Sequence, residues 1–154
     1  PSALGTAGAS HFSVIPENGD VIVGTMAADM EQPATVFRVH GQSAAQLIPE
    51  AQKSDLFRGE IVSFAQSARE RRVLWTHSKA PGVFSCSFDP GSKAELVIPA
   101  RSRGVAEVDG DVIVTHASKN WLIRLRSGEI TKKTAGPGKL AHRWGSHLVR
   151  LQPV

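Results

Sequence analysis

The sequence predicts an all-β protein built from a repeated unit of four antiparallel strands. Short segments rich in β-branched and aliphatic residues alternate with polar turns along the chain, and most of these turns contain Gly. Landmarks in the turns and strands recur at separations of 36–52 residues. No helical period competes, because the nearest candidate, Ser43 to Asp55, is interrupted by Pro49.

The first hairpin of the unit occurs at four places. Asn18-Gly19 and Asp109-Gly110 are strong turn signals, because hairpin turns of the primed types need positive φ at these positions. In the second copy a charged turn, Arg69 to Arg72, replaces the glycine, and in the last copy Gly145 supplies it. The strand pairs that these turns join lie within residues 12–23, 61–75, 105–114 and 140–149.

A second hairpin follows the first three. Its strands are Val36–Val39 with Gln46–Ile48, Phe84–Phe88 with Glu95–Ile98, and Leu122–Leu125 with Ile130–Thr131. The turn glycines Gly41, Gly91 and Gly128 are 50 and 37 residues apart. The second strands of the first hairpins, marked by Val21, Val73, Val112 and Leu148, are separated by 52, 39 and 36 residues. The spacings of the two sets of landmarks change in parallel along the chain, which indicates that both belong to one four-stranded unit.

Four antiparallel strands at this spacing resemble the blade of a β-propeller, the architecture of WD40 and kelch proteins. The resemblance runs from His11 to Leu151, but the Gly-His and Trp-Asp signature of WD40 repeats and the paired glycines of kelch repeats are absent. It implies a partial propeller over 11–154, with blades at about 11–52, 59–100 and 104–135 and a last hairpin at 139–151. The small residues of 1–10 predict a flexible N-terminal segment. A barrel or sandwich of twelve to fourteen strands is the alternative.

The composition is that of a globular protein. The chain has 154 residues, 41% hydrophobic and 21% charged, and no apolar run approaches the length of a membrane helix. Cys86 is the single cysteine, which excludes an internal disulfide, and its alternating surroundings predict a strand residue. Residues 1–60 hold three Lys/Arg against seven Asp/Glu, a balance of −4, and residues 61–154 hold fifteen against seven, a balance of +8. This split predicts opposed charge on two sides of the molecule.

Two histidines are candidate ligand-binding residues. His77 and His116 occupy corresponding places in Trp75-Thr76-His77 and Val114-Thr115-His116. Corresponding positions on neighbouring blades lie near each other, so two imidazoles could converge on a ligand. The alternative is that each histidine ties its own strand end to a loop by hydrogen bonds. No spaced Asp/Glu/His triad supports a metal site, and no cofactor is predicted.

The basic segment 119–126 is a candidate for contact with phosphate. Arg124 and Arg126 would point to one face of a strand, with Leu125 on the other. Lys132, Lys133 and further basic residues follow, and Trp121 and Trp144 could stack on exposed bases. The alternative is an ordinary solvated face. Asp20, Asp109 and Asp111 adjoin turns, where Asp is favoured because it satisfies backbone N–H groups.

No catalytic motif stands out, so no catalytic residue is assigned. We therefore expect a non-catalytic interaction or scaffold module, a propeller segment that a protein partner, other copies of itself or further sequence completes. The alternative is a fragment of a propeller enzyme or ligand-binding propeller with a site near His77 and His116. A weaker alternative is polyanion or nucleic-acid binding through residues 119–150, with affinity that falls steeply with salt.

Overall fold

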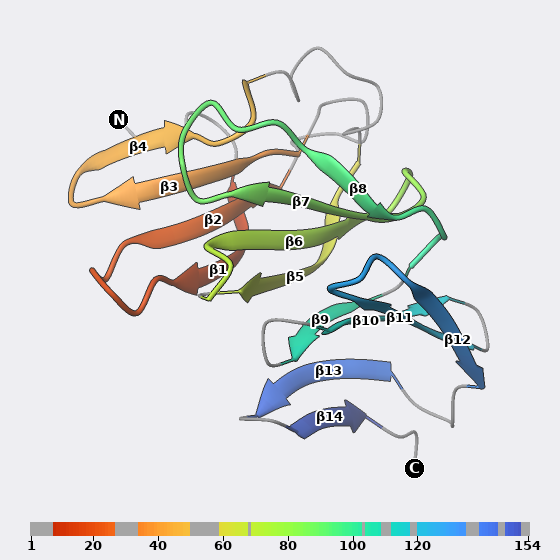
Figure 1. Cartoon of the computed structure of the whole chain (residues 1–154). Coiled ribbons are helices and arrows are strands. Elements are labelled where there is room, and N and C mark those ends of the chain that lie inside the picture. The colour runs from red at the N-terminus through yellow and green to blue at the C-terminus, as the bar shows by residue number, and fades with distance from the viewer. Residues whose placement is uncertain are drawn as a thin grey trace.

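The computed structural model describes residues 8–26, 34–49, 59–67, 69–102, 104–108, 112–117, 120–134, 139–144 and 147–151. Within these ranges the side chains are described up to residue 132, apart from those of 8–10, 26, 108, 112, 116–117 and 120–121. All the elements in Figure 1 are strands, and the described residues contain no α-helix.

The strands form three four-stranded antiparallel sheets and one two-stranded sheet. In each four-stranded sheet the strands lie side by side in chain order, so each strand pairs with the next one along the chain. The first sheet holds β1 (Gly8–Val14), β2 (Val21–Met26), β3 (Val36–His40) and β4 (Ser43–Gln46). The second holds β5 (Ile61–Ser67), β6 (Arg72–His77), β7 (Val83–Ser87) and β8 (Glu95–Ile98).

The third sheet and the last hairpin continue the series. The third sheet holds β9 (Val105–Val108), β10 (Val112–Ala117), β11 (Asn120–Leu125) and β12 (Ile130–Thr134). The two-stranded sheet holds β13 (Lys139–Trp144) and β14 (His147–Leu151). The four-stranded repeat predicted from the sequence is confirmed.

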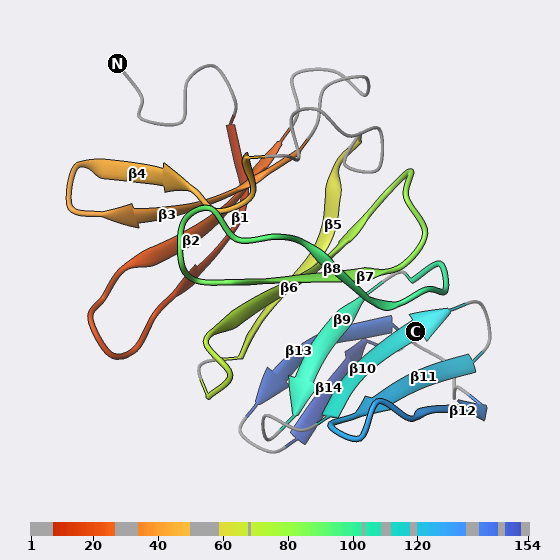
Figure 2. The same cartoon turned by 45° about the horizontal axis from the view of Figure 1, so that its top comes forward.

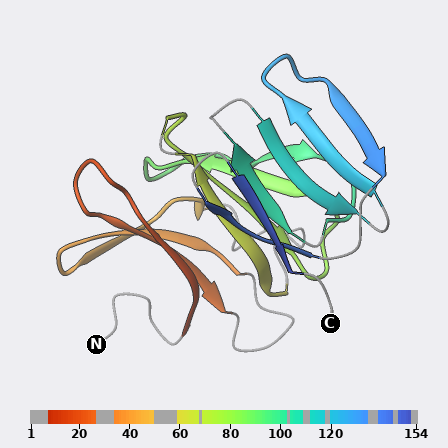
Figure 3. The same cartoon turned by 90° about the horizontal axis from the view of Figure 1, so that it is seen from below.

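The sheets follow one another, and their first strands lie together. β5 lies beside β1 and β9, and β9 lies beside β13. Figures 2 and 3 show the sheets from two further sides, with the first sheet at one side, the third sheet at the other, and β13–β14 beside β9. The first strand of each sheet is therefore its inner strand, and β4, β8 and β12 are the outer strands.

The predicted glycine turns within the described residues form as expected, and those at Asp109-Gly110 and Gly145 lie outside the described residues. Gly41 and Gly91 have φ of 57° and 80°, a region that costs a side-chain-bearing residue free energy. In the hairpin without glycine, Arg71 takes this conformation with φ of 51°. Its carbonyl accepts a hydrogen bond from the backbone N–H of Phe88 at 3.0 Å, and its guanidinium lies 6.0 Å from the centre of the Phe88 ring. These contacts stabilise the left-handed backbone conformation of Arg71, which is otherwise disfavoured for a residue with a side chain.

Two apolar clusters join the sheets. One lies between the first and second sheets, where Ile22 and Val36 meet Trp75 and Phe84 among the fully or nearly fully buried residues. The other lies between the second and third sheets and includes Leu74, Val83 and Leu122. Because successive side chains of a strand point to opposite faces, Trp75 and Leu74 place β6 in both clusters. Apolar contact on both faces of the second sheet thus holds the three sheets together.

Candidate functional site

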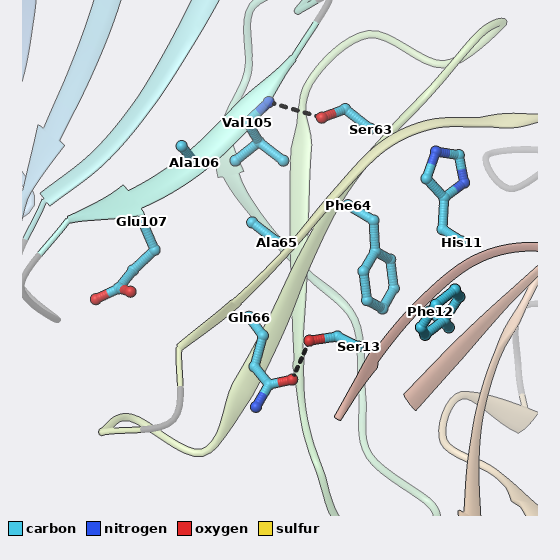
Figure 4. Close-up of a pocket in the computed structure, with 10 residues that line it drawn as sticks. All are labelled: His11, Phe12, Ser13, Ser63, Phe64, Ala65, Gln66, Val105, Ala106 and Glu107. Carbon is cyan, nitrogen blue, oxygen red and sulfur yellow. Dashed lines mark hydrogen bonds between the residues drawn. The ribbon is translucent and has the colours of Figure 1, made fainter. Parts of the chain in front are cut away.

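A pocket of about 350 Å³ lies among the inner strands (Figure 4). β1, β5 and β9 line it, so three different sheets contribute. Its lining residues are His11, Phe12, Ser13, Ser63, Phe64, Ala65, Gln66, Val105, Ala106 and Glu107. Half of these residues are apolar and half carry polar or ionisable side chains, so the lining is more polar than that of a typical small-molecule site.

Hydrogen bonds between sheets fix several of these polar groups. Ser13 Oγ donates to Gln66 Oε1, and Gln66 Nε2 donates to the carbonyl of Val14 at 3.2 Å. The backbone N–H of Val105 donates to Ser63 Oγ at 3.1 Å. The pocket walls are therefore tied together by contacts between residues far apart in the chain.

His11 and Glu107 are the ionisable groups of this pocket. The His11 ring is stacked on Phe64 with ring centres 6.3 Å apart, and partial burial lowers its pKa below the ordinary value. Glu107 is buried on β9. Figure 4 shows the two side chains at opposite sides of the pocket. Neither residue is predicted as a site residue from the sequence, because no recognisable motif surrounds Glu107.

His77, a predicted site residue, lies in the core. It ends β6, is 3% exposed, and accepts a hydrogen bond at Nε2 from Trp75 Nε1 at 2.9 Å. Its ring also contacts Phe84 edge-to-face at 5.6 Å between ring centres. Burial lowers the pKa of His77 from 6.5 to about 4, so the imidazole is neutral at physiological pH. It does not line the pocket of Figure 4.

His116 lies in β10, where its backbone pairs with Trp121 of β11. The His116 side chain is outside the described residues, so convergence of the two histidines stays a prediction. The neighbouring Thr115 is fully buried, and its hydroxyl donates to the carbonyl of Gly104. Within the described part of the chain, no group of three or more His, Cys, Asp or Glu side chains is placed to hold a metal ion.

Arg124 and Arg126 both reach from the third sheet to the second. Arg124 donates from its guanidinium to the carbonyl of Val97 at β8. The Arg126 guanidinium lies 2.6 Å from Glu70 Oε1 in the β5–β6 hairpin. Both side chains thus contribute to contacts between sheets, and their predicted role in phosphate binding stays a prediction.

The first sheet has an open apolar face. Its side chains come from two rows of directly paired residues, Phe12–Val23–Phe37 and Val14–Val21–Val39, which point to one side of the sheet. Phe12 is 74% exposed and Val14 is 51% exposed, and Val21, Phe37 and Val39 are half-buried. Val23, in the middle of the first row, is buried at 7%. We call these five residues the open face: Phe12, Val14, Val21, Phe37 and Val39.

The opposite side of the same sheet is covered. Ile22 and Val36 alternate with the open-face residues and lie in the cluster shared with the second sheet. In the second sheet the row Phe64–Trp75–Phe84 corresponds to Phe12–Val23–Phe37 by its place in the register. Trp75 and Phe84 are buried against the first sheet. The same kind of sheet face is therefore covered in one sheet and open in the other.

Comparisons with known proteins show the fold. No protein-family model matches the chain, and no curated protein matches it. Among solved structures it is similar to a calcium-binding protein, regucalcin from Agrobacterium tumefaciens, with a TM-score of 0.58 and 18% identity over 85% of this chain and 46% of that one. It is also similar to a gluconolactonase from Xanthomonas campestris, with a TM-score of 0.59 and 13% identity over 83% of this chain and 47% of that one.

Both neighbours belong to a type of protein with six to seven propeller blades. The chain spans about half the length of each. The predicted fold class, an all-β partial propeller, is thus confirmed. In the described part of the structure no helix is long and apolar enough to cross a membrane.

Proposed function

We propose that this chain is a non-catalytic interaction module, a segment of a β-propeller that binds another β-sheet through its open face. The main support for this proposal is the difference in burial between equivalent faces of the first two sheets. Trp75 and Phe84 of the second sheet are buried against a neighbour, while Phe12 and Val14 of the first are largely exposed. Contiguous exposed apolar side chains typically mark a contact surface.

The free energy available to such a contact is substantial. Full burial of a Val or Phe side chain is worth about 1.5–3 kcal/mol. The half-buried Val21, Phe37 and Val39 would add to the contribution of Phe12 and Val14. Each face of a propeller blade packs on a neighbouring blade, so a four-stranded sheet is the partner that fits this surface.

Thiol labelling tests the proposal. Val14→Cys places a thiol on the open face, and Leu96→Cys places one on β8 of the second sheet, where the native side chain is equally exposed at 51%. The native Cys86 gives little background, because burial raises its pKa to about 12. In an extract of the cells that make the protein, we expect Val14→Cys to react at least about tenfold more slowly with a maleimide than Leu96→Cys. Equal rates would refute the proposal.

A second candidate function is binding of a small polar ligand in the pocket of Figure 4. The observation in its favour is the placement of Glu107 and His11 in a pocket that three sheets share. The two neighbours suggest the probes, Ca²⁺ and gluconolactone. Binding is measured by calorimetry, with Glu107→Gln as the matched variant. A signal that Glu107→Gln abolishes supports this function, and no heat with either probe argues against it.

A further inference from the structure

We infer that a cleft between the second and third sheets binds a small phosphate monoester. The cleft shares no residue with the open face, so this inference does not depend on the proposed function. Three features support it: an arginine without a carboxylate partner, two arginines in exposed ion pairs, and buried serine hydroxyls on the same side of the second sheet.

The cleft has a volume of about 230 Å³. The third sheet contributes to it a row of directly paired residues across β9, β10 and β11. The lining residues include Ser67, Arg72 and Leu74 of the second sheet and Glu107, Ile113 and Arg124 of the third. Glu70 and Arg126, which lie in turns of the two sheets, also line it. We call this site the arginine cleft.

Arg124 carries a positive charge that no carboxylate neutralises within the described part of the chain. Its side chain is half-buried, and its guanidinium donates to the neutral carbonyl of Val97. The ion pairs of the described residues include partners for Arg72 and Arg126 but none for Arg124. A partly buried charge is costly without an opposite charge beside it. An anion in the arginine cleft would provide that charge.

The other two arginines form ion pairs that an entering anion can replace. Arg72 Nη2 lies 3.1 Å from Oε2 of Glu95, whose side chain is 67% exposed. Arg126 Nη2 lies 2.6 Å from Oε1 of Glu70, and this pair is also exposed, at 57% and 38%. Exposed ion pairs contribute little to stability, because water and salt compete for both charges. Three guanidinium groups are therefore available to one ligand at little cost.

Glu107 determines which part of the cleft an anion can occupy. It lines both the arginine cleft and the pocket of Figure 4, so its carboxylate marks the inner end of the cleft. In the row of paired residues, Ile113 lies between Glu107 and Arg124. Repulsion between like charges therefore directs the anion away from Glu107 and toward the arginines.

Two serines of the second sheet add neutral polar groups. Ser67 is 1% exposed, and its hydroxyl accepts from the backbone N–H of Glu70 at 3.2 Å, which leaves the hydroxyl able to donate to a ligand. Ser85 pairs directly with Leu74 and is fully buried, and its hydroxyl has no hydrogen-bond partner among the described residues. Buried hydroxyls normally have a partner, so this side of the second sheet still has a polar group to satisfy.

A phosphate monoester fits these groups best. Its phosphoryl group carries a charge of about −1.5 to −2 at pH 7 and has three strong acceptor oxygens. The planar guanidinium fork binds two such oxygens at once, so three arginines can surround one phosphoryl group. A phosphodiester, as in a nucleic acid backbone, and a carboxylate each carry a single charge and offer fewer oxygens.

A series of small anions tests the ligand class. We expect calorimetry on the purified full chain at low salt to show methyl phosphate binding at least about tenfold more tightly than dimethyl phosphate or acetate. Equally tight binding of dimethyl phosphate or acetate would overturn the assignment to a monoester. No binding of methyl phosphate at millimolar concentration would overturn the site itself.

Arg124→Gln tests the position of the anion. It should weaken the binding of methyl phosphate at least about tenfold, because a charge-assisted hydrogen bond is lost. Arg101→Gln is the matched control, since Arg101 is also an arginine that donates to a backbone carbonyl, that of Ser78 at 3.3 Å, but it lies outside the cleft. Equal losses in the two variants would indicate a general effect of net charge and would overturn the inference.

Glu70→Gln provides a test of opposite sign that does not rely on the folding of Arg124→Gln. Glu70 and Arg126 are both exposed, so the change spares the core and frees Arg126 from its carboxylate partner. We expect methyl phosphate to bind about threefold more tightly or better. Glu60→Gln, an equal change of charge at an exposed residue outside the cleft, is the control. No gain of Glu70→Gln over this control would overturn the placement of the anion beside Arg126.

Discussion

Trp75 Nε1 and His77 Nε2 lie 2.9 Å apart, with the indole N–H as the donor. The two residues are two positions apart on β6, so their side chains point to the same face of the second sheet. An indole can only donate, and the imidazole nitrogen must therefore be unprotonated to accept. The hydrogen bond and the burial of the ring both favour neutral His77.

Neutral His77 predicts a stability that falls in mild acid. Its pKa is about 4 in the folded chain against 6.5 for the free side chain, so the unfolded chain binds the proton more readily. Its contribution is fully present above pH 6.5 and is lost as the pH falls toward 4. At one proton per molecule the loss is about 1.4 kcal/mol per pH unit within this window. Urea unfolding between pH 5 and 8 measures it.

The matched variant is His77→Gln, whose side-chain oxygen can accept from Trp75 but does not titrate in this range. We expect the free energy of unfolding of this variant to fall less steeply with decreasing pH, by a slope that corresponds to roughly one bound proton. The lowered pKa of His11 acts in the same direction, so a residual slope remains in the variant. A slope identical to that of the wild type would contradict the assignment.

The strand pattern made the repeat predictable, because turns reveal themselves locally. Gly41, Gly91 and Gly128 were selected as turn residues from the sequence, and all three have positive φ. The pairing in each hairpin then follows from the position of its turn. A polar hairpin without glycine was also predicted, although its left-handed residue, Arg71, has no signal of its own.

The side chains that pack against each face of a sheet could not be predicted from the sequence in the same way. His77 stood out as a titratable residue near a strand end, but contacts with Trp75 and Phe84, made by the fold, place it in the core. The pocket, in contrast, is formed by residues that do not stand out in the sequence. Ser13 and Gln66 are 53 residues apart and meet only when two sheets pack. Contacts of this kind depend on the succession of sheets, which no short segment encodes.

Cys86 should be almost inert in the folded chain. Burial raises the pKa of its thiol from 9.0 to about 12, which lowers the thiolate fraction about 1,000-fold near pH 8. We expect the reaction with Ellman's reagent to be limited by opening of the structure and to become fast in denaturant. A rapid reaction of the native protein would show that this face of the second sheet is accessible.

Gly82 is expected to tolerate substitution poorly. Its φ is 120°, and a Cβ there would lie 2.8 Å from the carbonyl oxygen of Ile98 and 2.4 Å from the end of the Leu96 side chain. Gly82→Ala should therefore lower the free energy of unfolding by about 2 kcal/mol or more. Gly91→Ala is the control, because φ is also positive but no atom lies within 4 Å. It should cost about 1 kcal/mol, and equal losses in urea unfolding would contradict the steric argument.

We expect a second loss of stability at lower pH, when Asp20 in the β1–β2 hairpin is protonated. Asp20 is 4% exposed, and its carboxylate lies 2.6 Å from His40 Nδ1 and accepts from Arg38 Nε at 2.7 Å. The hydrogen bond to His40, followed by that to Arg38, lowers the pKa of Asp20 below 3.8. The stability it contributes is therefore present above pH 3.8 and is lost as the pH falls through the lowered value.

Asp20→Asn separates this transition from that of His77. The variant should be less stable at neutral pH, because Arg38 loses its 2.7 Å ion pair with Asp20 and keeps the longer one, 3.9 Å, with the exposed Asp89. Its stability should change less than that of the wild type below pH 3.8. Arg38 also reaches the carbonyl of Phe88 at 3.4 Å, so the loss should loosen the contact between the first two sheets. Increased hydrogen exchange around Phe88 would report this loosening. Unchanged exchange there would confine the role of Asp20 to its own hairpin.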